Sequence, residues 1–344
     1  MRIALIGIFG SKIDEGMRKL CVQMETAARH QQHEVLTVQT GDFCRGKAWA
    51  ELRRFRPRCL HYLTGPTVFS LSALKFHSLT LPAPVTTVAT GIRPYLSSNG
   101  RRMLPWMAPD HYLAQSRRWA QLFAKAGSRC VDFPNGVDTR RFQPLSAERR
   151  AELKARWGLP TDKPVVLHVG HVKENRNLDS LLAVQRSGRY QVWIVGSESE
   201  SKPGPWRTRL EEAGCRIFTR YVPAIEEVYQ AADRYVFTVK ALPTAQFPRH
   251  YQEIGVIDLP LSILEAMACG LPVLSTRHDA VAHFCGDVAG LGFFDGTSAD
   301  CLAQLDRLET GPLATRKAAE RLDLQRVMGQ LGEFYSRIAA EGQQ

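Results

Sequence analysis

The sequence lacks paired cysteines and long apolar runs. Its eight cysteines are scattered without a C-x-x-C pair, and a chain of 344 residues can build a core without disulfide bonds. No window holds 18 uninterrupted apolar residues, and the opening MRIALIGIFG has no cleavage site of the signal-peptide type. We therefore expect reduced thiols and a cytoplasmic protein that is neither exported nor membrane-spanning.

The sequence also lacks two common nucleotide-binding motifs. Its first glycine loop, GIFGSK at residues 7–12, has neither the G-x-G-x-x-G spacing of a dinucleotide site nor the GKS or GKT of a P-loop. A nicotinamide-dependent enzyme is therefore disfavoured. Gly10 can still bring backbone N–H groups close to a phosphate, and a simple tight turn explains the same residue equally well.

Negative charge is scarce in the first half of the chain. Residues 1–159 carry 25 Lys and Arg against 11 Asp and Glu, whereas residues 160–344 carry 20 against 23. A basic half attracts nucleic acid, anionic lipid headgroups or a polyanionic substrate. No DNA- or RNA-binding motif accompanies it, so we do not expect a nucleic-acid partner.

Two basic clusters of the first half contain apolar residues. RGKAWAELRRFRPR covers residues 45–58 and NGRRMLPWM covers residues 99–107, so that Trp49, Phe55 and Trp106 are interleaved with arginines. Such mixtures are typical of a membrane interface, where rings sit at headgroup level. A solvated basic face over buried aromatics is the alternative.

The order of apolar segments predicts two α/β domains. Strand-length runs such as RIALIGIF alternate with helical patterns, and this β-α-β rhythm indicates a mostly parallel sheet wound with helices. The rhythm restarts at PVVLHVG, after a proline-flanked charged helix within residues 137–164 that we interpret as the joint. We therefore predict a first domain at 1–145, a second at 160–325 and a C-terminal helix at 326–344.

The loop VGHVKENRNLDSLL opens the second domain's first helical segment. Its strand ends at Gly170, and His171, Lys173 and Arg176 cluster before the helix that is predicted to begin near Asn177. Cations beside a helix N-terminus are unfavourable because the helix dipole is already positive there. A bound anion such as a diphosphate would compensate, and a solvated loop is the alternative.

The stretch DLPLSILEAMACGLPVLST contains a lone carboxylate in an apolar helix. Ser262 and Glu265 have the S-x-x-E spacing of a capping box, in which each side chain satisfies a backbone N–H at the helix start. The same helix start, with Leu261, also presents amides to an anion, and a first-turn carboxylate can bind a sugar diol. The residues themselves leave both interpretations open.

Four segments together resemble the family 4 glycosyltransferases of GT-B fold. They are FPNGVDTRRFQP, VGHVKENRNLDSLL, YVPAIEEVYQAADRYVF and LPLSILEAMACGLPVLST, in that family's order and spacing. The resemblance implies two Rossmann-like, doubly wound domains that face a central cleft. It also implies a C-terminal helix that packs back towards the first domain.

The resemblance also implies roles for individual residues. Glu265 matches the glutamate that contacts the nucleotide ribose. The carboxylate that contacts the transferred sugar would fall on Ile257, and the neighbouring Asp258 is the nearest acid. Arg176 and His171 match the two cationic positions that neutralise the leaving diphosphate.

Further residues complete the predicted substrate contacts. Lys173 adds a charge near the diphosphate, Gly170 and Val222 lie in the matching loops, and Leu261 and Ser262 can present amides to the sugar. In the first domain the family's histidine is missing, and Thr90 or Arg93 can stand in for it.

The implied function is retaining transfer of a sugar from a nucleotide diphosphate sugar, with neither a metal nor another cofactor. The acceptor would be a glycan or a lipid-linked or other anionic molecule. The basic first half would hold it and could contact an anionic membrane surface, placing the protein on the inner face of the cell membrane. A nucleotide-sugar epimerase of the same fold and a degenerate, non-enzymatic binding subunit are the alternatives.

Overall fold

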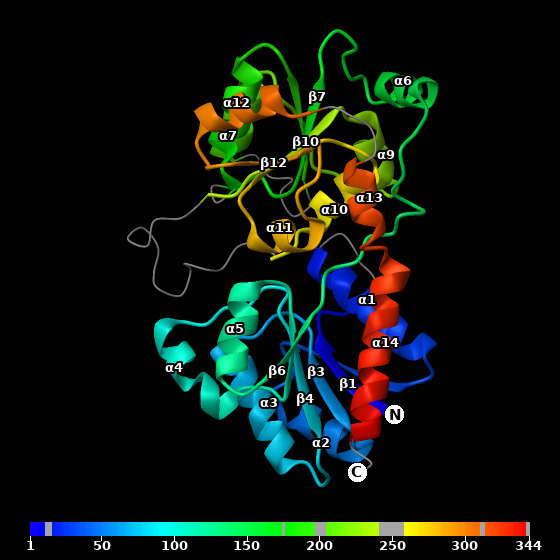
Figure 1. Ribbon diagram of the computed structural model, residues 1–344, viewed down its shortest axis with the longest axis vertical. Coiled ribbons are helices and arrows are strands. Elements are labelled where there is room, and N and C mark those ends of the chain that lie inside the picture. The colour runs from blue at the N-terminus through cyan, green and yellow to red at the C-terminus, as the bar shows by residue number, and fades with distance from the viewer. Residues whose placement is uncertain (11–15, 174–175, 197–203, 241–257, 310–313, 342–344) are drawn as a thin grey trace. The chain divides into compact units, whose positions relative to one another are not determined.

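The computed structural model describes residues 1–10, 16–173, 176–196, 204–240, 258–309 and 314–341. These residues form two compact units, which we call the first and second domains (Figure 1). The first domain consists of the described residues within 1–135 and 325–341, with residues 258 and 259. The second consists of those within 136–240 and 260–324.

The first domain is built on a parallel sheet with the strand order β2-β1-β3-β4-β5-β6. Its strands are β1 Arg2–Gly7, β2 Glu34–Gln39, β3 Cys59–Tyr62, β4 Thr86–Thr90, β5 His111–Ala114 and β6 Arg129–Asp132. Its helices are α1 Gly16–His30, α2 Gly46–Phe55, α3 Val68–Thr80, α4 Ser98–Met107, α5 Arg117–Lys125 and, from the far end of the chain, α14 Leu324–Glu341.

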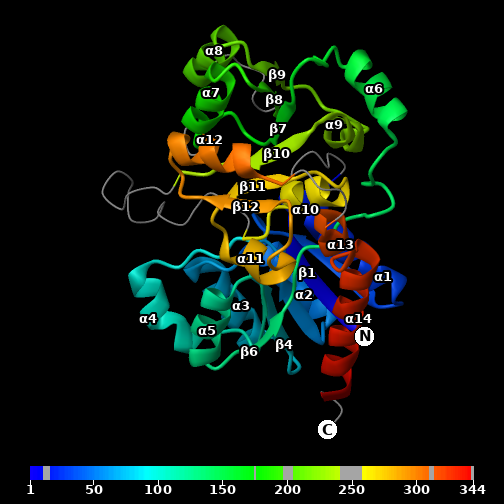
Figure 2. The ribbon, with the colours of Figure 1, turned by 45° about the horizontal axis from the view of Figure 1, so that its top comes forward.

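The second domain repeats this plan with the strand order β12-β11-β10-β7-β8-β9. Its strands are β7 Val165–Val169, β8 Gln191–Val195, β9 Arg216–Phe218, β10 Arg234–Phe237, β11 Val273–Thr276 and β12 Leu291–Phe294. Its helices are α6 Ala147–Arg156, α7 Leu178–Arg186, α8 Pro205–Glu212, α9 Ile225–Ala231, α10 Leu261–Ala268, α11 Asp279–Cys285, α12 Ser298–Arg307 and α13 Ala314–Glu320. Figure 2 shows α7, α8 and α12 on one side of this sheet and α9, α10 and α13 on the other.

Strand β3 shows why helices cover both faces of the first sheet. All four of its residues are buried, as is typical of a parallel strand with a helical layer on each side. Leu60 and Tyr62 belong to a core that also contains side chains of α2 and α3. Successive side chains alternate in direction, so His61 points to the opposite face, where α14 lies.

The C-terminal helix packs on the first domain, as predicted. The Tyr335 hydroxyl lies 2.7 Å from His61 Nδ1, and the other ring nitrogen of His61 lies 2.6 Å from the Thr90 hydroxyl oxygen. Phe334 makes an edge contact with the His111 ring. These contacts tie α14 to β3 and β5, and His61 links β3 to β4. Within the described ranges, no helix combines the length and hydropathy that crossing a bilayer requires.

The buried His61 makes the first domain sensitive to acid. Burial lowers the pKa of His61 from 6.5 to about 3. Between these pH values the unfolded chain binds a proton at His61 and the folded domain does not. Stability is therefore complete above pH 6.5 and is lost as the pH falls from 6.5 towards 3, by at most about 1.4 kcal/mol per pH unit.

Chemical unfolding monitored at several pH values tests this effect. His61→Gln should flatten the loss of first-domain stability between pH 6.5 and 4. An unchanged pH dependence in this variant would contradict the assignment to His61.

Candidate functional site

The loop after β7 is held close to the sheet by Gly170. Its N–H donates to the Val195 carbonyl at the end of β8, with an N···O distance of 3.0 Å. A Cβ at this position would lie 2.9 Å from Nε2 of His168, whose ring is fully buried and lies 2.9 Å through Nδ1 from the Val236 carbonyl. A glycine is therefore required where the chain turns over the histidine ring.

The backbone of Arg176 is fixed by one hydrogen bond within its own loop and one from the residue after β10. Its N–H donates to the Lys173 carbonyl at 3.0 Å, and its carbonyl accepts from the hydroxyl of Thr238, the residue after β10. The next residue, Asn177, adopts a left-handed conformation with φ 49° and donates through Nδ2 to the Gly296 carbonyl. Helix α7 then begins at Leu178, one residue later than predicted.

The guanidinium of Arg176 lies near a buried histidine that follows β11. Burial and, next, the charge of Arg176 lower the pKa of His278 to about 4. His278 is therefore neutral at neutral pH, and its ring packs edge-on against Phe237 with the ring centres 5.4 Å apart. The cation of Arg176 is thus placed at the carboxyl ends of β10 and β11 beside a ring that adds no competing charge.

Helix α10 begins differently from the capping-box interpretation. Pro260 occupies the N-cap and makes no side-chain cap hydrogen bond, so Ser262 is the second helical residue rather than the cap. Glu265 is consequently the fifth helical residue. It lies beyond the first turn, whereas the sequence analysis predicted a first-turn position. The carboxylate therefore does not act as a cap.

The Glu265 carboxylate is instead part of the packed interior of the second domain. Glu265 is 7% exposed, and its Oε2 accepts a hydrogen bond from the Tyr229 hydroxyl of α9 at 2.8 Å. The pKa of Tyr229 is raised well above its usual value by burial and then by the charge of Glu265. Tyr229 thus stays protonated and remains a donor to the carboxylate.

A second tyrosine connects the two predicted parts of the site. Tyr235 of β10 is fully buried, and its hydroxyl donates to the Val169 carbonyl at 3.4 Å. Burial raises the pKa of Tyr235, a hydrogen bond with Ser262 lowers it, and the charges of Glu265 and Arg176 act on it with opposite signs. The end of β7, the start of α10 and Arg176 therefore surround one phenol.

The far end of α10 is anchored by Arg316 of α13. Its guanidinium donates to the carbonyls of Ala268 at 2.8 Å, Phe142 at 2.6 Å and Thr139 at 3.0 Å. A cation at the C-terminus of a helix complements the helix dipole. This contact fixes α10, and hence Glu265, relative to the segment that enters the second domain.

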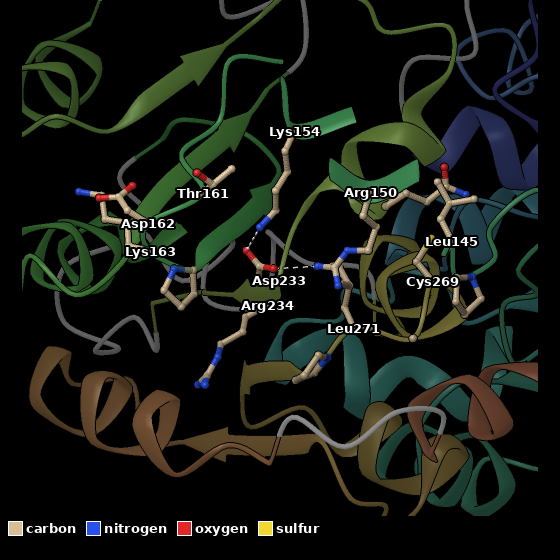
Figure 3. Close-up of a pocket in the computed structure, with 15 residues that line it drawn as sticks. Leu145, Arg150, Lys154, Thr161, Asp162, Lys163, Asp233, Arg234, Cys269 and Leu271 are labelled. Carbon is tan, nitrogen blue, oxygen red and sulfur yellow. Dashed lines mark hydrogen bonds and ion pairs between the residues drawn. The ribbon is translucent and has the colours of Figure 1, made fainter. Parts of the chain in front are cut away.

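A cavity of about 540 Å³ lies at the opposite edge of the second sheet (Figure 3). Its lining includes Pro164, Arg234 and Pro272, which lie at the amino ends of β7, β10 and β11. None of the predicted site residues lines it. Ligands of open α/β sheets bind beyond the carboxyl ends of the strands.

The charged groups of this cavity largely satisfy one another. Asp233 accepts from Arg150 at 2.8 Å and from Lys154 at 2.6 Å, as the dashed lines in Figure 3 show, and from the Val165 N–H at 2.8 Å. Arg150 and Lys154 belong to α6, the helix of the predicted joint. The cluster therefore attaches α6 to the second sheet.

The remaining predicted residues are spread over both domains. His171 and Lys173 lie in the loop before Arg176, Leu261 is the first residue of α10, and Val222 lies between β9 and α9. Gly10, exposed Arg93 and Asp258 belong to the first domain, where the Asp258 N–H donates to the Ile92 carbonyl at 3.0 Å. Ile257 lies outside the described residues. The roles assigned to all these residues remain predictions.

Sequence reasoning missed the three buried rings that support the site. Tyr229 and Tyr235 lie in the quoted segment YVPAIEEVYQAADRYVF, and His278 directly follows the strand that ends in LST. Polar rings next to strand ends and on an otherwise apolar helix face are the signal that could have identified them. Their partners come from distant segments, so no local spacing predicts the contacts.

Removal of the Tyr229 hydroxyl tests the support of Glu265. We expect Tyr229→Phe to destabilise the second domain by about 1–3 kcal/mol, because a buried carboxylate loses a donor. Tyr190→Phe is the matched control: its hydroxyl donates to the more exposed Asp306 at 2.8 Å, and its loss should cost roughly 0.5–1 kcal/mol. Equal losses of unfolding free energy in Tyr229→Phe and Tyr190→Phe, measured by chemical unfolding, would contradict the role of Tyr229 as a donor to a buried carboxylate.

Comparisons with known proteins find similarity to glycosyltransferases. The family described as glycosyl transferases group 1 matches residues 163–308. A GDP-mannose-dependent alpha-mannosyltransferase of Mycobacterium tuberculosis is 27% identical over 273 residues, which are 74% of this chain and 66% of that protein. A D-inositol 3-phosphate glycosyltransferase of Kineococcus radiotolerans is 27% identical over 54% of this chain and 42% of its own length. The matched part of the chain thus spans 66% and 42% of these two relatives' lengths.

Solved structures share the fold over nearly the whole chain. A sucrose-phosphate synthase from Thermosynechococcus elongatus matches with a TM-score of 0.74 and 16% identity over 99% of both chains. Anabaena HepE in complex with UDP-glucose matches with a TM-score of 0.73 and 16% identity over 98% of this chain and 100% of that one. The predicted GT-B fold class is confirmed. Residues 163–308 of this chain are thus similar to the group 1 glycosyltransferases, in agreement with the family 4 type that the motifs resemble.

Proposed function

We propose that the protein is a retaining glycosyltransferase that moves a sugar from a nucleotide diphosphate sugar to an acceptor. The observation that carries the proposal is the arrangement around Tyr235. The buried Tyr235 hydroxyl donates to the Val169 carbonyl at the carboxyl end of β7, and Ser262, Glu265 and Arg176 all influence its pKa. The relatives are named as transferases, which supports this proposal over an epimerase or a non-enzymatic subunit.

In this proposal Glu265 binds the nucleotide ribose. An ionised carboxylate can accept about four hydrogen bonds, so the bond from Tyr229 leaves capacity for the two ribose hydroxyls. The carboxylate is already buried and held by α9 before the ligand arrives. Little side-chain freedom is then lost on binding, which favours affinity.

The diphosphate would lie between the starts of α7 and α10. The first-turn amides of a helix have no partner within the helix, and the dipole there favours an anion. Arg176 supplies a permanent positive charge, and Lys173 and His171 lie in the same loop. These groups would stabilise the negative charge that builds on the leaving phosphate, with about 3–4 kcal/mol for each well-placed donor by analogy with oxyanion holes.

The transfer step needs no protein nucleophile in this proposal. The anomeric C–O bond to the donor phosphate breaks, the acceptor hydroxyl oxygen forms the new bond on the same face, and a donor phosphate oxygen takes the acceptor's proton. Fixed cations and helix amides provide the charge stabilisation, so we propose that the reaction proceeds without a metal ion or another cofactor. Within the described ranges, no group of three or more His, Cys, Asp or Glu side chains could hold a metal.

The acceptor would bind to the carboxyl edge of the first sheet. There the loop after β3 approaches the loop after β4 so closely that a Cβ on Gly65 would lie 2.5 Å from the Arg93 carbonyl oxygen. Arg93 is exposed beside this contact, and Gly10 ends the described part of the loop after β1. We propose a glycan, lipid-linked or other anionic acceptor here, in line with the phosphate-bearing inositol in one relative's name.

Asp258 is the proposed contact of the transferred sugar. It is held against the loop after β4 by the hydrogen bond to the Ile92 carbonyl, and it is followed by Pro260 and the start of α10. The proposed location is the cytoplasm, where the eight free thiols persist without oxidation. No nucleic-acid partner is proposed.

Nucleotide binding tests the proposal directly. In EDTA, one of UDP, GDP or ADP should raise the melting temperature of the second domain, with about 2.7 kcal/mol of stabilisation at a concentration of 100 times the Kd. Glu265→Gln and Arg176→Ala should weaken this binding at least tenfold, because each removes a charge-dependent contact.

Arg186→Ala is the matched control for Arg176→Ala. It removes the same charge from the exposed last residue of α7, and we expect it to leave nucleotide affinity unchanged. Nucleotide binding that depends on an added metal, or that survives both site substitutions, would refute the proposed donor site.

A further inference from the structure

The outer face of α3 exposes three large apolar side chains. Phe69, Phe76 and Leu79 are 70%, 57% and 73% exposed, and their spacing of seven and three residues places them on one side of the helix. The inner side of α3 is also apolar, because Leu71 and Leu74 are buried in the first domain. The sheet therefore needs only one face of α3, and the second apolar face points to solvent.

A cavity of about 490 Å³ lies between this face and α2. Phe69 and Phe76 line one wall, and Trp49 of α2 lines the other. The indole is held in place: its N–H donates to the Thr80 hydroxyl at 3.2 Å, and the guanidinium of Arg53 lies 4.6 Å from the ring centre. The groove is thus a formed, mostly apolar surface with a cation at its edge.

Helix α4 extends the apolar surface on the other flank of α3. The Ser72 hydroxyl on the outer side of α3 lies 3.6 Å from the Met107 sulfur of α4, so the two helices are in contact. On α4, Met103 is 47% and Trp106 is 74% exposed. We call these exposed residues of α2, α3 and α4 the α2–α4 surface; Figures 1 and 2 show all three helices in the first domain.

The charge around the α2–α4 surface is almost entirely positive. Residues 45–58 contain six Lys and Arg, residues 68–80 contain one and residues 97–107 contain two, whereas Glu51 is the single carboxylate in these three segments. Arg45, Lys47, Arg53, Arg54, Arg56, Arg58, Lys75 and Arg102 are all exposed. This combination of exposed rings and cations selects an anionic partner that also accepts apolar side chains.

We propose that the α2–α4 surface docks on a bilayer that contains acidic phospholipids. Rings and aliphatic side chains would enter the boundary between headgroups and acyl chains, and the cations would contact the lipid phosphates. A protein partner fits less well, because it would need many Asp and Glu among its apolar side chains, and interface centres are depleted in Asp and Glu. The inference is independent of the proposed glycosyl transfer, since it concerns a different surface.

Docking through α3 would bring the bilayer close to loops of the first domain. Helix α3 begins at Val68, three residues after the Gly65 that contacts Arg93. A bilayer bound to the α2–α4 surface would therefore lie near the loops at the carboxyl edge of the first sheet. A membrane-borne molecule could reach these loops without leaving the bilayer.

Vesicle co-sedimentation of the full chain tests the proposal. Vesicles of phosphatidylcholine with 30% phosphatidylglycerol should bind the protein at least tenfold more tightly than pure phosphatidylcholine, and binding should weaken in high salt. Phe69→Ser combined with Phe76→Ser should lower the partition coefficient at least tenfold, because two rings lose their insertion. Arg53→Glu combined with Arg54→Glu should lower it at least as much.

Arg326→Glu combined with Arg337→Glu is the matched control. It makes the same charge change on exposed residues of α14, in the same domain but outside the α2–α4 surface, and it should cost less than threefold. Equal losses in the control and the Arg53/Arg54 variant would overturn the proposal, as would absent vesicle binding. A wild-type dimer that the Phe69/Phe76 variant dissolves, with vesicle binding unchanged, would identify a self-association surface and also overturn it.

Discussion

The buried carboxylate of Glu265 is the constraint on which the candidate site depends. A carboxylate removed from water is costly unless hydrogen bonds compensate for the lost hydration. The Tyr229 hydroxyl provides one such bond, and it remains a donor because burial and the carboxylate itself raise its pKa. The Tyr229–Glu265 hydrogen bond therefore fixes the orientation of α10 about its own axis relative to α9. Arg316 fixes the C-terminal end of α10. The same constraint orients Ser262 towards Tyr235. A ligand that binds to Glu265 therefore contacts side chains whose positions are already fixed.

The loop after β7 is arranged by similar means. Gly170 lets the chain pass over the buried His168 ring, and Thr238 holds the carbonyl of Arg176. The Arg176 guanidinium then lies near His278, whose pKa is lowered by burial and, next, by the Arg176 charge, so that the ring stays neutral at neutral pH. Hydrogen bonds from neighbouring elements of the second domain thus fix both halves of the site. Lys173 and Arg176 carry positive charge in the loop before α7, and the proposal of a diphosphate rests on that charge.

The sequence predicted the sheets and helices well because their signals are local. The alternation of strand runs with helical patterns led to the two parallel sheets and to the C-terminal helix, whose apolar face is buried on the first domain. It also led to the family, since four motifs stood in order along the chain. The capping-box interpretation was wrong because the Ser262–Glu265 spacing does not say where a helix begins, and the N-cap is Pro260, two residues before Ser262. Tyr229, Tyr235 and His278 could not be predicted because their contacts join segments about 30 to 100 residues apart.

The two domains differ in charge as well as in proposed task. In the second domain Asp233 pairs with Arg150 and Lys154, whereas the segments of α2 to α4 hold nine Lys and Arg and a single carboxylate, Glu51. The central claim is that a nucleoside diphosphate binds at the carboxyl edge of the second sheet. A crystal structure with such a ligand tests it most directly. The account predicts that the ribose hydroxyls donate to Glu265 and that the diphosphate lies beside Arg176. A diphosphate bound instead in the cavity at the amino edge, against Lys163 and Arg150, would contradict it.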